Sequence, residues 1–278
     1  MRSPSLLFFK ENWFLLGRMT SFNWIPRSIR GIGDFFLFLK ETFRALKNLW
    51  VRRGLFLKYC EFIGVSSLAI ILFSAVFMGA VLGYQLYVGF HVFGAEALLG
   101  ASVGVALFRD LAPVFAAIMV TGRAGAAMAA ELATMRITEQ IDALEVMAID
   151  PYAYLVSPRV SAGFLMMPLL SVVFAVIASL SSAFIACGVM GLSYATFWDQ
   201  FAKYVDSMDL IHCTTKGAVF GFLIASIGCY YGFRAKGGAS AVGHATRATV
   251  VATCLAILLS DYIVTSLLPF GFDYLILE

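Results

Sequence analysis

Charged residues are scarce in this chain. Only 13% of its 278 residues are charged, whereas 61% are hydrophobic. Ordinary soluble domains have roughly a quarter of their residues charged, and one soluble core of this size cannot bury so much apolar surface. The composition therefore excludes a soluble globular protein and places the chain in a lipid bilayer.

Histidine and cysteine are also few, and neither occurs at metal-ligand or redox spacing. The three histidines are scattered, and neither H-E-x-x-H nor G-x-S-x-G is present. We therefore expect no metal site and no catalytic residue. The five cysteines are interpreted as small buried apolar side chains. They are Cys60, Cys187, Cys213, Cys229 and Cys254.

The chain lacks the nucleotide-binding motif G-x-x-x-x-G-K-[ST]. Its one glycine-rich basic stretch, residues 232–247, follows no predicted strand, so it is a weak candidate for a phosphate-binding loop. The chain is thus not its own ATPase of that type. We expect no cofactor in it.

The sequence is instead rich in long apolar stretches. About 20 mostly apolar residues cross the hydrocarbon core of a bilayer. Five such windows occur, at residues 62–88, 98–121, 160–188, 213–233 and 248–268. The sequence therefore predicts an all-α membrane protein with about five transmembrane helices in a domain of residues 61–278. An N-terminal cytoplasmic and interfacial region of residues 1–60 precedes it, without the order of a cleavable signal peptide.

Lysine and arginine are distributed unevenly between the two sides. Eleven of the twenty precede residue 60, whereas residues 89–97 and 269–278 have none and residues 189–212 have only Lys203. Cytoplasmic loops are enriched in these residues. We therefore expect a cytoplasmic N-terminus and a C-terminus outside, and we attribute the net charge of +3 to topology and not to nucleic-acid binding. The other basic loop residues are Arg123, Arg136 and Arg159 after the second span, and Arg234, Lys236 and Arg247 after the fourth.

Residues 34–50 alternate with helical periodicity. Phenylalanine, leucine and Trp50 lie on one side, and Lys40, Arg44 and Lys47 lie on the other. This pattern predicts an amphipathic helix in the headgroup region of the membrane. The alternative is a soluble helix that packs on another domain.

A short amphipathic stretch separates the second and third windows. On a helical wheel its acidic residues share one face and its apolar residues the other. Thr138 is the expected N-cap, and Asp150-Pro151 ends the helix. About three turns cannot span a membrane, so we expect the membrane domain on one face and a soluble partner on the other. The alternative is a solvated helix with no partner. The acidic face holds Glu139, Asp142 and Glu145, and the apolar face holds Ile137, Ile141, Leu144, Met147 and Ala148.

Arg109 and Asp110 fall near the middle of the second window, where charge is costly and usually functional. Pro113 cannot donate a hydrogen bond to the carbonyl of Arg109, so we expect a kink and a polar notch there. A guanidinium is suited to a phosphate or carboxylate, which predicts an anionic headgroup as ligand. The alternative is an internal salt bridge that holds the helices in register, with Asp261 in the last span as a candidate polar partner.

Two polar residues near the outer end of the first window, Tyr84 and Gln85, are further candidates for a lipid-binding cavity. Tyrosine is also common in the interfacial belt, and Gln85 has an equal explanation as a side chain that reaches the headgroups.

Small residues recur four apart in several windows, which predicts close helix packing. The pairs are Gly79 and Gly83, Gly100 and Gly104, Gly217 and Gly221, and Gly228 and Gly232.

Several stretches resemble the MlaE permease family, the membrane subunits of lipid-transporting ABC systems that maintain outer-membrane lipid asymmetry. The resemblance covers about residues 55–268, and the block EQIDAL (139–144) in its setting is highly specific. The stretches are LFRDLAP (107–113), TGRAGAA (121–127), AELATM (130–135), TEQIDAL (138–144), MAIDP (147–151) and GGASAVGHAT (237–246).

The resemblance implies a multi-pass homodimer in the bacterial inner membrane. It also implies two cytoplasmic ATPase subunits that bind ATP and Mg²⁺, often a STAS-domain subunit, an MCE-domain lipid-binding protein on the periplasmic side, and phospholipid between the permease copies. Arg109 and Asp110 match a basic–acidic pair of the family, with Asp in place of the commoner Glu. Arg234 and Lys236 occupy positions that vary among relatives and receive no binding role. The residues implied to contact the ATPase are Glu139, Gln140, Ile141, Asp142, Leu144, Glu145 and Met147.

The predicted function is therefore that of a phospholipid-transporting ABC permease that couples ATP hydrolysis in a partner to the opening and closing of a lipid cavity. An ion-gradient-driven secondary transporter that uses Arg109, Asp110 and Asp261 is the alternative. A scaffold that only anchors envelope proteins is a third possibility.

Overall fold

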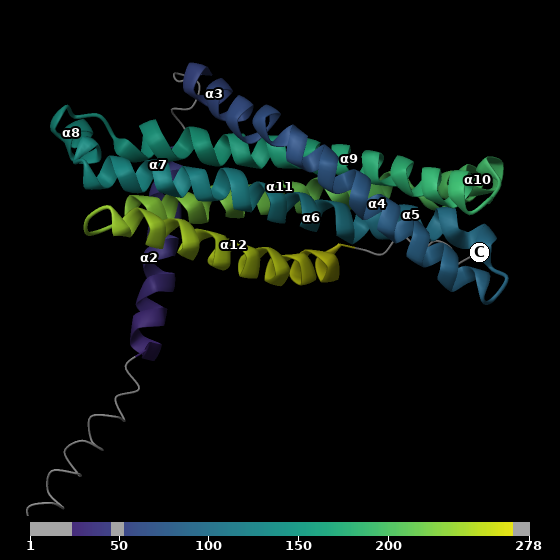
Figure 1. Cartoon of the computed structure of the whole chain (residues 1–278). Helices are drawn as coiled ribbons and strands as arrows, with labels where there is room; N and C mark the ends of the chain where they lie inside the picture. The colour runs from purple at the N-terminus through teal and green to yellow at the C-terminus, as the bar shows by residue number, and fades with distance from the viewer. Residues whose placement is uncertain (1–23, 46–52, 269–278) are drawn as a thin grey trace, which may run out of the picture. The chain divides into compact units, whose positions relative to one another are not determined.

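The structure is a computed structural model that describes residues 24–45 and 53–268. The chain divides into two compact units, Met1–Glu41 and Thr42–Glu278. The described residues form helices and no strands, which confirms the all-α prediction (Figure 1). The α-helices are α2 (Trp24–Ala45), α3 (Arg53–Ile63), α4 (Leu68–His91), α5 (Leu99–Ala106), α6 (Ala112–Val120), α7 (Ala126–Ile137), α8 (Gln140–Val146), α9 (Ser157–Ala183), α10 (Tyr194–Tyr204), α11 (Ser207–Phe233) and α12 (Ser240–Leu267).

Five helical stretches of the described residues are long and apolar enough to cross a membrane, which confirms the number predicted. Each of the five predicted windows lies mainly within one of them. The stretches are Arg53–His91, Glu96–Ile137, Tyr152–Val189, Ser207–Phe233 and Ser240–Leu267.

The second stretch differs most from its predicted window. Helices α5, α6 and α7 follow one another through π-helical turns at Leu107–Leu111 and Thr121–Gly125. Residues 122–137 therefore continue the helix, where the sequence predicted a loop. This segment is rich in alanine, the residue with the highest helix propensity, which favours its helical continuation.

The predicted N-terminal amphipathic segment is helical as far as it is described. Helix α2 covers residues 34–45 of it, and residues 46–50 lie outside the described part of the chain. Lys40 and Arg44 are exposed, whereas Phe38 is buried. Placement of this helix in the headgroup region stays a prediction.

Helices α9 and α11 form the centre of the second unit. Helix α9 packs against α4, α11, α3 and α6, and α11 also packs against α12 and α7. A Cβ atom placed on Gly221 of α11 would lie 2.1 Å from the Gly163 carbonyl oxygen of α9. A Cβ on Gly79 of α4 would lie equally close to the Ala178 carbonyl oxygen of α9. Glycine lets these backbones touch, as expected for helices that pack in lipid.

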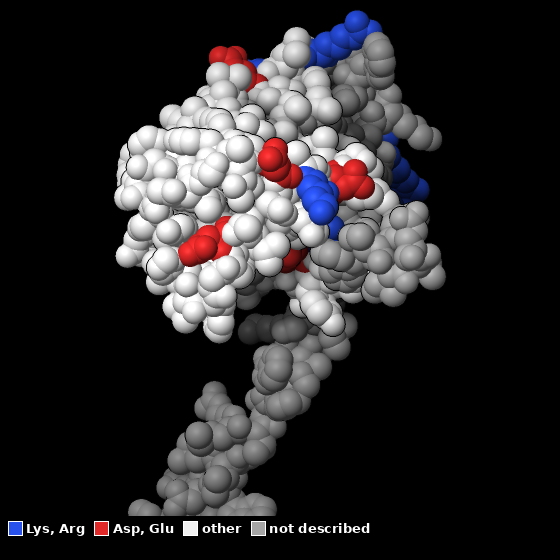
Figure 2. Space-filling model, turned by 90° about the vertical axis from the view of Figure 1, so that its right-hand side faces the viewer, with Lys and Arg blue, Asp and Glu red and all other residues white. Residues whose placement is uncertain are grey.

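The two ends of the bundle differ in structure and charge. Helix α8 projects at one end, and α10 lies at the other (Figure 1). Figure 2 looks onto the α10 end and shows a mostly uncharged face with scattered acidic groups. Lys203 is the only Lys or Arg among residues 89–98 and 190–206, which also contain Glu96, Asp199 and Asp206. Cations are therefore scarce at this end among the described residues.

Candidate functional site

Five charged side chains from three parts of the chain meet inside the bundle. Arg109 donates from Nε to a carboxylate oxygen of Asp209. Lys216 Nζ lies 2.5 Å from an Asp110 oxygen and 2.9 Å from an Asp261 oxygen. Arg109 and Asp110 belong to the π-helical turn Leu107–Leu111, Asp209 and Lys216 to α11, and Asp261 to α12. We call this set of five the charge network.

The π-helical turn determines where its two charged residues point. The N–H of Ala112 donates to the carbonyl of Leu107, five residues back, and Pro113 in the next turn has no N–H to donate. A widened turn of this kind, which often occurs at functional sites, thus lies directly before Pro113. The polar notch expected there stays a prediction. Neighbouring Arg109 and Asp110 reach partners on α11 that are seven residues, or about 10 Å, apart.

The charge network is anchored deep in the bundle. Lys216 and Asp209 are fully buried, whereas the Asp110 side chain is 53% exposed. Buried charges are costly unless they are paired, so the two cations and their carboxylates depend on one another. The Arg109 Nε is already occupied by Asp209, which favours the salt-bridge interpretation of Arg109. Asp261 joins through Lys216, not through a direct bond to Arg109.

Two members of the charge network, Asp209 and Lys216, did not emerge as site residues from sequence reasoning. Lys216 lies inside the fourth apolar window, and an intramembrane cation is a signal of function that should have identified it. Asp209 also has a local role that its sequence setting indicates. The Asp206 side chain and the Asp209 side chain each accept a backbone N–H at the start of α11, which is a capping box.

We predict that Asp206→Ala lowers the free energy of unfolding by about 1 kcal/mol, because it removes the side chain that caps α11. The measurement is thermal unfolding of the purified protein in detergent. Asp199→Ala on α10 is the matched control, since Asp199 is exposed and makes no side-chain bond among those described. Equal melting temperatures for the two variants would show that the cap contributes nothing.

Tyr84 and Gln85 lie apart from the charge network. Both side chains are exposed on α4, which packs mainly against α9. The hydrogen bonds and ion pairs found among the described residues do not connect either one to Arg109 or Asp110. The structure therefore gives no support for grouping them with the charged pair.

Helix α8 lies at the other candidate site, at the end of the bundle. Ile141 is fully buried and fixes the helix to the core, and Arg136 Nη1 of α7 lies 2.5 Å from an Asp142 oxygen. Glu139, Gln140 and Glu145 are exposed. The helix is thus held to the bundle on one side and presents acidic side chains on the other.

The details of α8 correct two expectations. Thr138 does not cap it, because the Thr138 hydroxyl donates to the Thr134 carbonyl at the end of α7, and left-handed Glu139 precedes the helix. The predicted apolar face is also interrupted: Leu144 is partly buried, but Met147 is 68% exposed. Helix α8 has ended by Val146, so the wheel no longer applies to Met147.

Arg159, predicted to lie in a loop, is a buried residue of α9. Its Nη2 lies 2.9 Å from a Glu131 oxygen of α7, and its Nη1 donates to the Leu155 carbonyl at 2.6 Å. Its guanidinium lies 4.3 Å from the ring centre of Tyr59 on α3. This arginine therefore joins α3, α7 and α9 close to the α8 end of the bundle. Among the described residues no group of His, Cys, Asp and Glu is placed to hold a metal ion.

Comparison with known proteins assigns these features to a family. The family model described as Permease MlaE matches residues 56–267. A probable ABC transporter permease protein of Rickettsia conorii is 38% identical over 238 residues, which cover 86% of this chain and 92% of the relative. A Haemophilus influenzae protein named as the intermembrane phospholipid transport system permease protein MlaE is 36% identical over 215 residues, or 77% and 82% of the two chains. Residues 56–267, which the family model matches, include both the charge network and α8.

Proposed function

The chain belongs to the MlaE permease family, and we propose on that basis that it is the membrane subunit of an ABC transporter that moves phospholipid between the inner membrane and the outer envelope. The Haemophilus relative carries phospholipid transport in its name. The Rickettsia relative is named as a probable ABC transporter permease. ATP and Mg²⁺ would then be bound by a separate ATPase subunit.

The observation that carries this proposal is the exposed face of α8. Val146 is 88% exposed and Met147 is 68% exposed, beside exposed Glu139 and Glu145. Apolar side chains surrounded by acidic ones, at the polar end of a membrane bundle, are suited to contact a soluble protein. Buried Ile141 makes α8 a rigid attachment point and not a loose loop.

A continuous helical stretch leads from Ile137, beside α8, to the charge network. Helices α5 to α7 form one stretch, Glu96–Ile137, which carries Arg109 and Asp110 in its first half and ends beside α8. Asp110 lies 27 residues before Ile137, a distance of about 40 Å along a helix. Displacement of α8 by an ATPase would move this stretch against α11 and α12, to which the charge network ties it. The π-helical turns are where such a helix bends most readily.

Charge asymmetry supports the proposed orientation. The α8 end carries the basic residues Arg136, Arg234 and Lys236, whereas Lys203 is the lone Lys or Arg among the described residues at the α10 end. By the positive-inside rule this charge distribution favours a cytoplasmic α8, where an ATPase can reach it. A second copy of the chain, an MCE-domain protein at the α10 end and a STAS-domain subunit complete the proposed assembly.

We predict that Val146→Glu combined with Met147→Glu reduces co-purification of the ATPase subunit at least about tenfold, because buried apolar anchors dominate protein interfaces. Both side chains are largely exposed, so the fold should survive the change. The measurement is recovery of the ATPase with the tagged chain from membranes, followed by lipid transfer in proteoliposomes. Val92→Glu with Phe93→Glu is the control, since these residues are 76% and 83% exposed at the opposite end.

Full recovery of the ATPase with the α8 variant would show that α8 is not the docking element. Transport that follows an ion gradient without any ATPase would favour the secondary transporter that uses Arg109, Asp110 and Asp261.

A further inference from the structure

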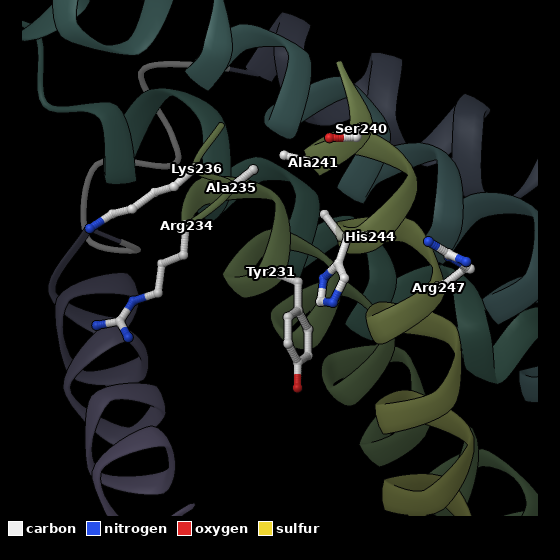
Figure 3. Close-up of a pocket in the computed structure, with 9 residues that line it drawn as sticks. Tyr231, Arg234, Ala235, Lys236, Ser240, Ala241, His244 and Arg247 are labelled. Carbon is white, nitrogen blue, oxygen red and sulfur yellow. The ribbon is translucent and has the colours of Figure 1, made fainter. Parts of the chain in front are cut away.

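A basic cavity lies where α11 ends and α12 begins. Its volume is about 540 Å³, and its polar lining comes from Tyr231, Arg234, Lys236, Ser240, His244 and Arg247. In Figure 3 Arg234 and Lys236 extend on one side of the view, Arg247 lies on the other, and Tyr231 and His244 lie between them. The lining contains no Asp or Glu.

Packing contacts hold the residues that line the cavity in place. Buried Ala235 and Ala245 pack together with Ala133 of α7, which holds the α11–α12 connection against the bundle. Arg234 Nη1 lies 3.1 Å from the Tyr230 hydroxyl, and the guanidinium lies 5.0 Å from the Tyr230 ring centre. These contacts restrict the basic side chain before any ligand binds, which lowers the entropy cost of binding.

The positive charge of the cavity is only partly compensated within the protein. Lys236 and Arg247 take part in none of the salt bridges found in the described part of the chain. Arg247 uses its Nε to donate to the Gly243 carbonyl at 3.1 Å, which leaves its Nη groups for another acceptor. Arg234, Lys236 and Arg247 line the same cavity, and guanidinium and ammonium groups are the usual ligands of phosphate oxygens.

The start of α12 adds to the positive potential. This helix begins at Ser240 without a side-chain cap, after a turn in which Gly237 has φ of +116°. The helix is 28 residues long, and its dipole places partial positive charge at the Ser240 end. The backbone therefore reinforces the charge of the side chains.

The length of α12 places the cavity at the depth of lipid headgroups. Twenty-eight residues extend about 42 Å, whereas the hydrocarbon core is about 30 Å thick. Residues 248–267 contain a single charged residue, Asp261, and alone match that thickness. Residues 240–247, five of which line the cavity, then lie outside the hydrocarbon. Tyr231 is of the type enriched at this boundary.

We infer that this cavity binds one phosphate-bearing anionic group, and that the group is the headgroup of an anionic phospholipid held at the membrane surface. The position of the cavity at the level of the lipid headgroups favours a headgroup over phosphate from solution. Arg247 and Asp261 are 14 residues apart on α12, or about 21 Å, so this site is separate from the charge network. Arg234 and Lys236, to which the sequence assigned no role, are part of it.

Native mass spectrometry of the full chain in detergent tests this inference, with phosphatidylglycerol and phosphatidylcholine of equal acyl length added together. The wild-type chain is expected to retain one phosphatidylglycerol with a clear preference over phosphatidylcholine. Lys236→Gln with Arg247→Gln should weaken that retention roughly tenfold or more, because each of the two cations adds to the binding free energy of an anionic lipid. Lys58→Gln with Lys203→Gln removes the same charge elsewhere and should retain the lipid.

The remaining outcomes distinguish the sources of the ligand. Displacement of phosphatidylglycerol by millimolar inorganic phosphate would assign the site to soluble phosphate, and retention would assign it to the headgroup. Unchanged retention by the double variant overturns the inference. So does a loss of ATPase co-purification without any loss of lipid, since the cluster would then be a protein contact. Lys236→Gln alone, on the exposed connection, serves if the double variant does not fold.

Discussion

Replacing Lys216 by methionine is expected to lower the free energy of unfolding by about 3 kcal/mol and to abolish lipid transfer. Lys216 is fully buried and lies within 2.9 Å of both Asp110 and Asp261. Removing the cation leaves two carboxylates close together in an apolar setting, and breaking a buried ion pair in this way costs about 3 to 5 kcal/mol. The lower value is expected because the Asp110 side chain is half exposed.

A compensated variant separates the structural role of Lys216 from its functional role. Lys216→Met combined with Asp110→Asn and Asp261→Asn removes all three charges and should restore most of the lost stability, since buried ion groups can often be replaced by neutral ones. Lipid transfer should stay absent if the charges act in transport. The measurements are thermal unfolding in detergent and transfer between proteoliposomes with the ATPase present.

Two results would contradict this account of Lys216. A single Lys216→Met variant with wild-type stability would show that Asp110 and Asp261 are neutral or solvated without the lysine. Normal transfer by the triple variant would restrict the three residues to holding helices together. Arg109 and Asp209 stay unchanged in every variant. Any effect on stability or lipid transfer therefore comes from the charges around Lys216 and not from the neighbouring ion pair.

The sequence predicts the scaffold of this protein well because its signals are local. An apolar window of span length is a property of consecutive residues, and all five windows correspond to helices. The acidic face of α8 is likewise visible on a wheel, and Asp142 and Glu145 are exposed as expected. Glycine pairs four residues apart lie at helix contacts for the same reason: Gly79 faces Ala178 across α4 and α9.

The ion-pair partners of the buried charged residues come from distant parts of the chain, so the sequence does not predict them. Arg109 and Asp209 are 100 residues apart, and only the packing of α11 against the π-helical turn brings them together. The sequence predicts a loop at Arg159 because the apolar window starts at residue 160, whereas α9 begins at Ser157. Tyr59 and Glu131 are the partners that allow this arginine to be buried.

Gly221→Ala is expected to destabilise the protein by about 3 kcal/mol, although it adds a single methyl group. The new Cβ would lie 2.1 Å from the Gly163 carbonyl oxygen and 2.7 Å from the Met167 Cβ. The oxygen is a backbone atom and cannot rotate away, so α9 and α11 must separate. Overpacking of this kind typically costs about 1 to 3 kcal/mol, and a contact with fixed backbone belongs at the upper end.

Two further glycines give a graded comparison with Gly221→Ala. Gly163→Ala meets the Gly221 carbonyl oxygen at 2.7 Å, so a smaller loss is expected. Gly89→Ala on α4 meets nothing within 4 Å and should be neutral or raise stability by up to about 1 kcal/mol, because alanine favours helix. Thermal unfolding in detergent measures all three. If Gly221→Ala melted like Gly89→Ala, the backbones of α9 and α11 would not be in contact, and side chains would have to hold these two central helices together.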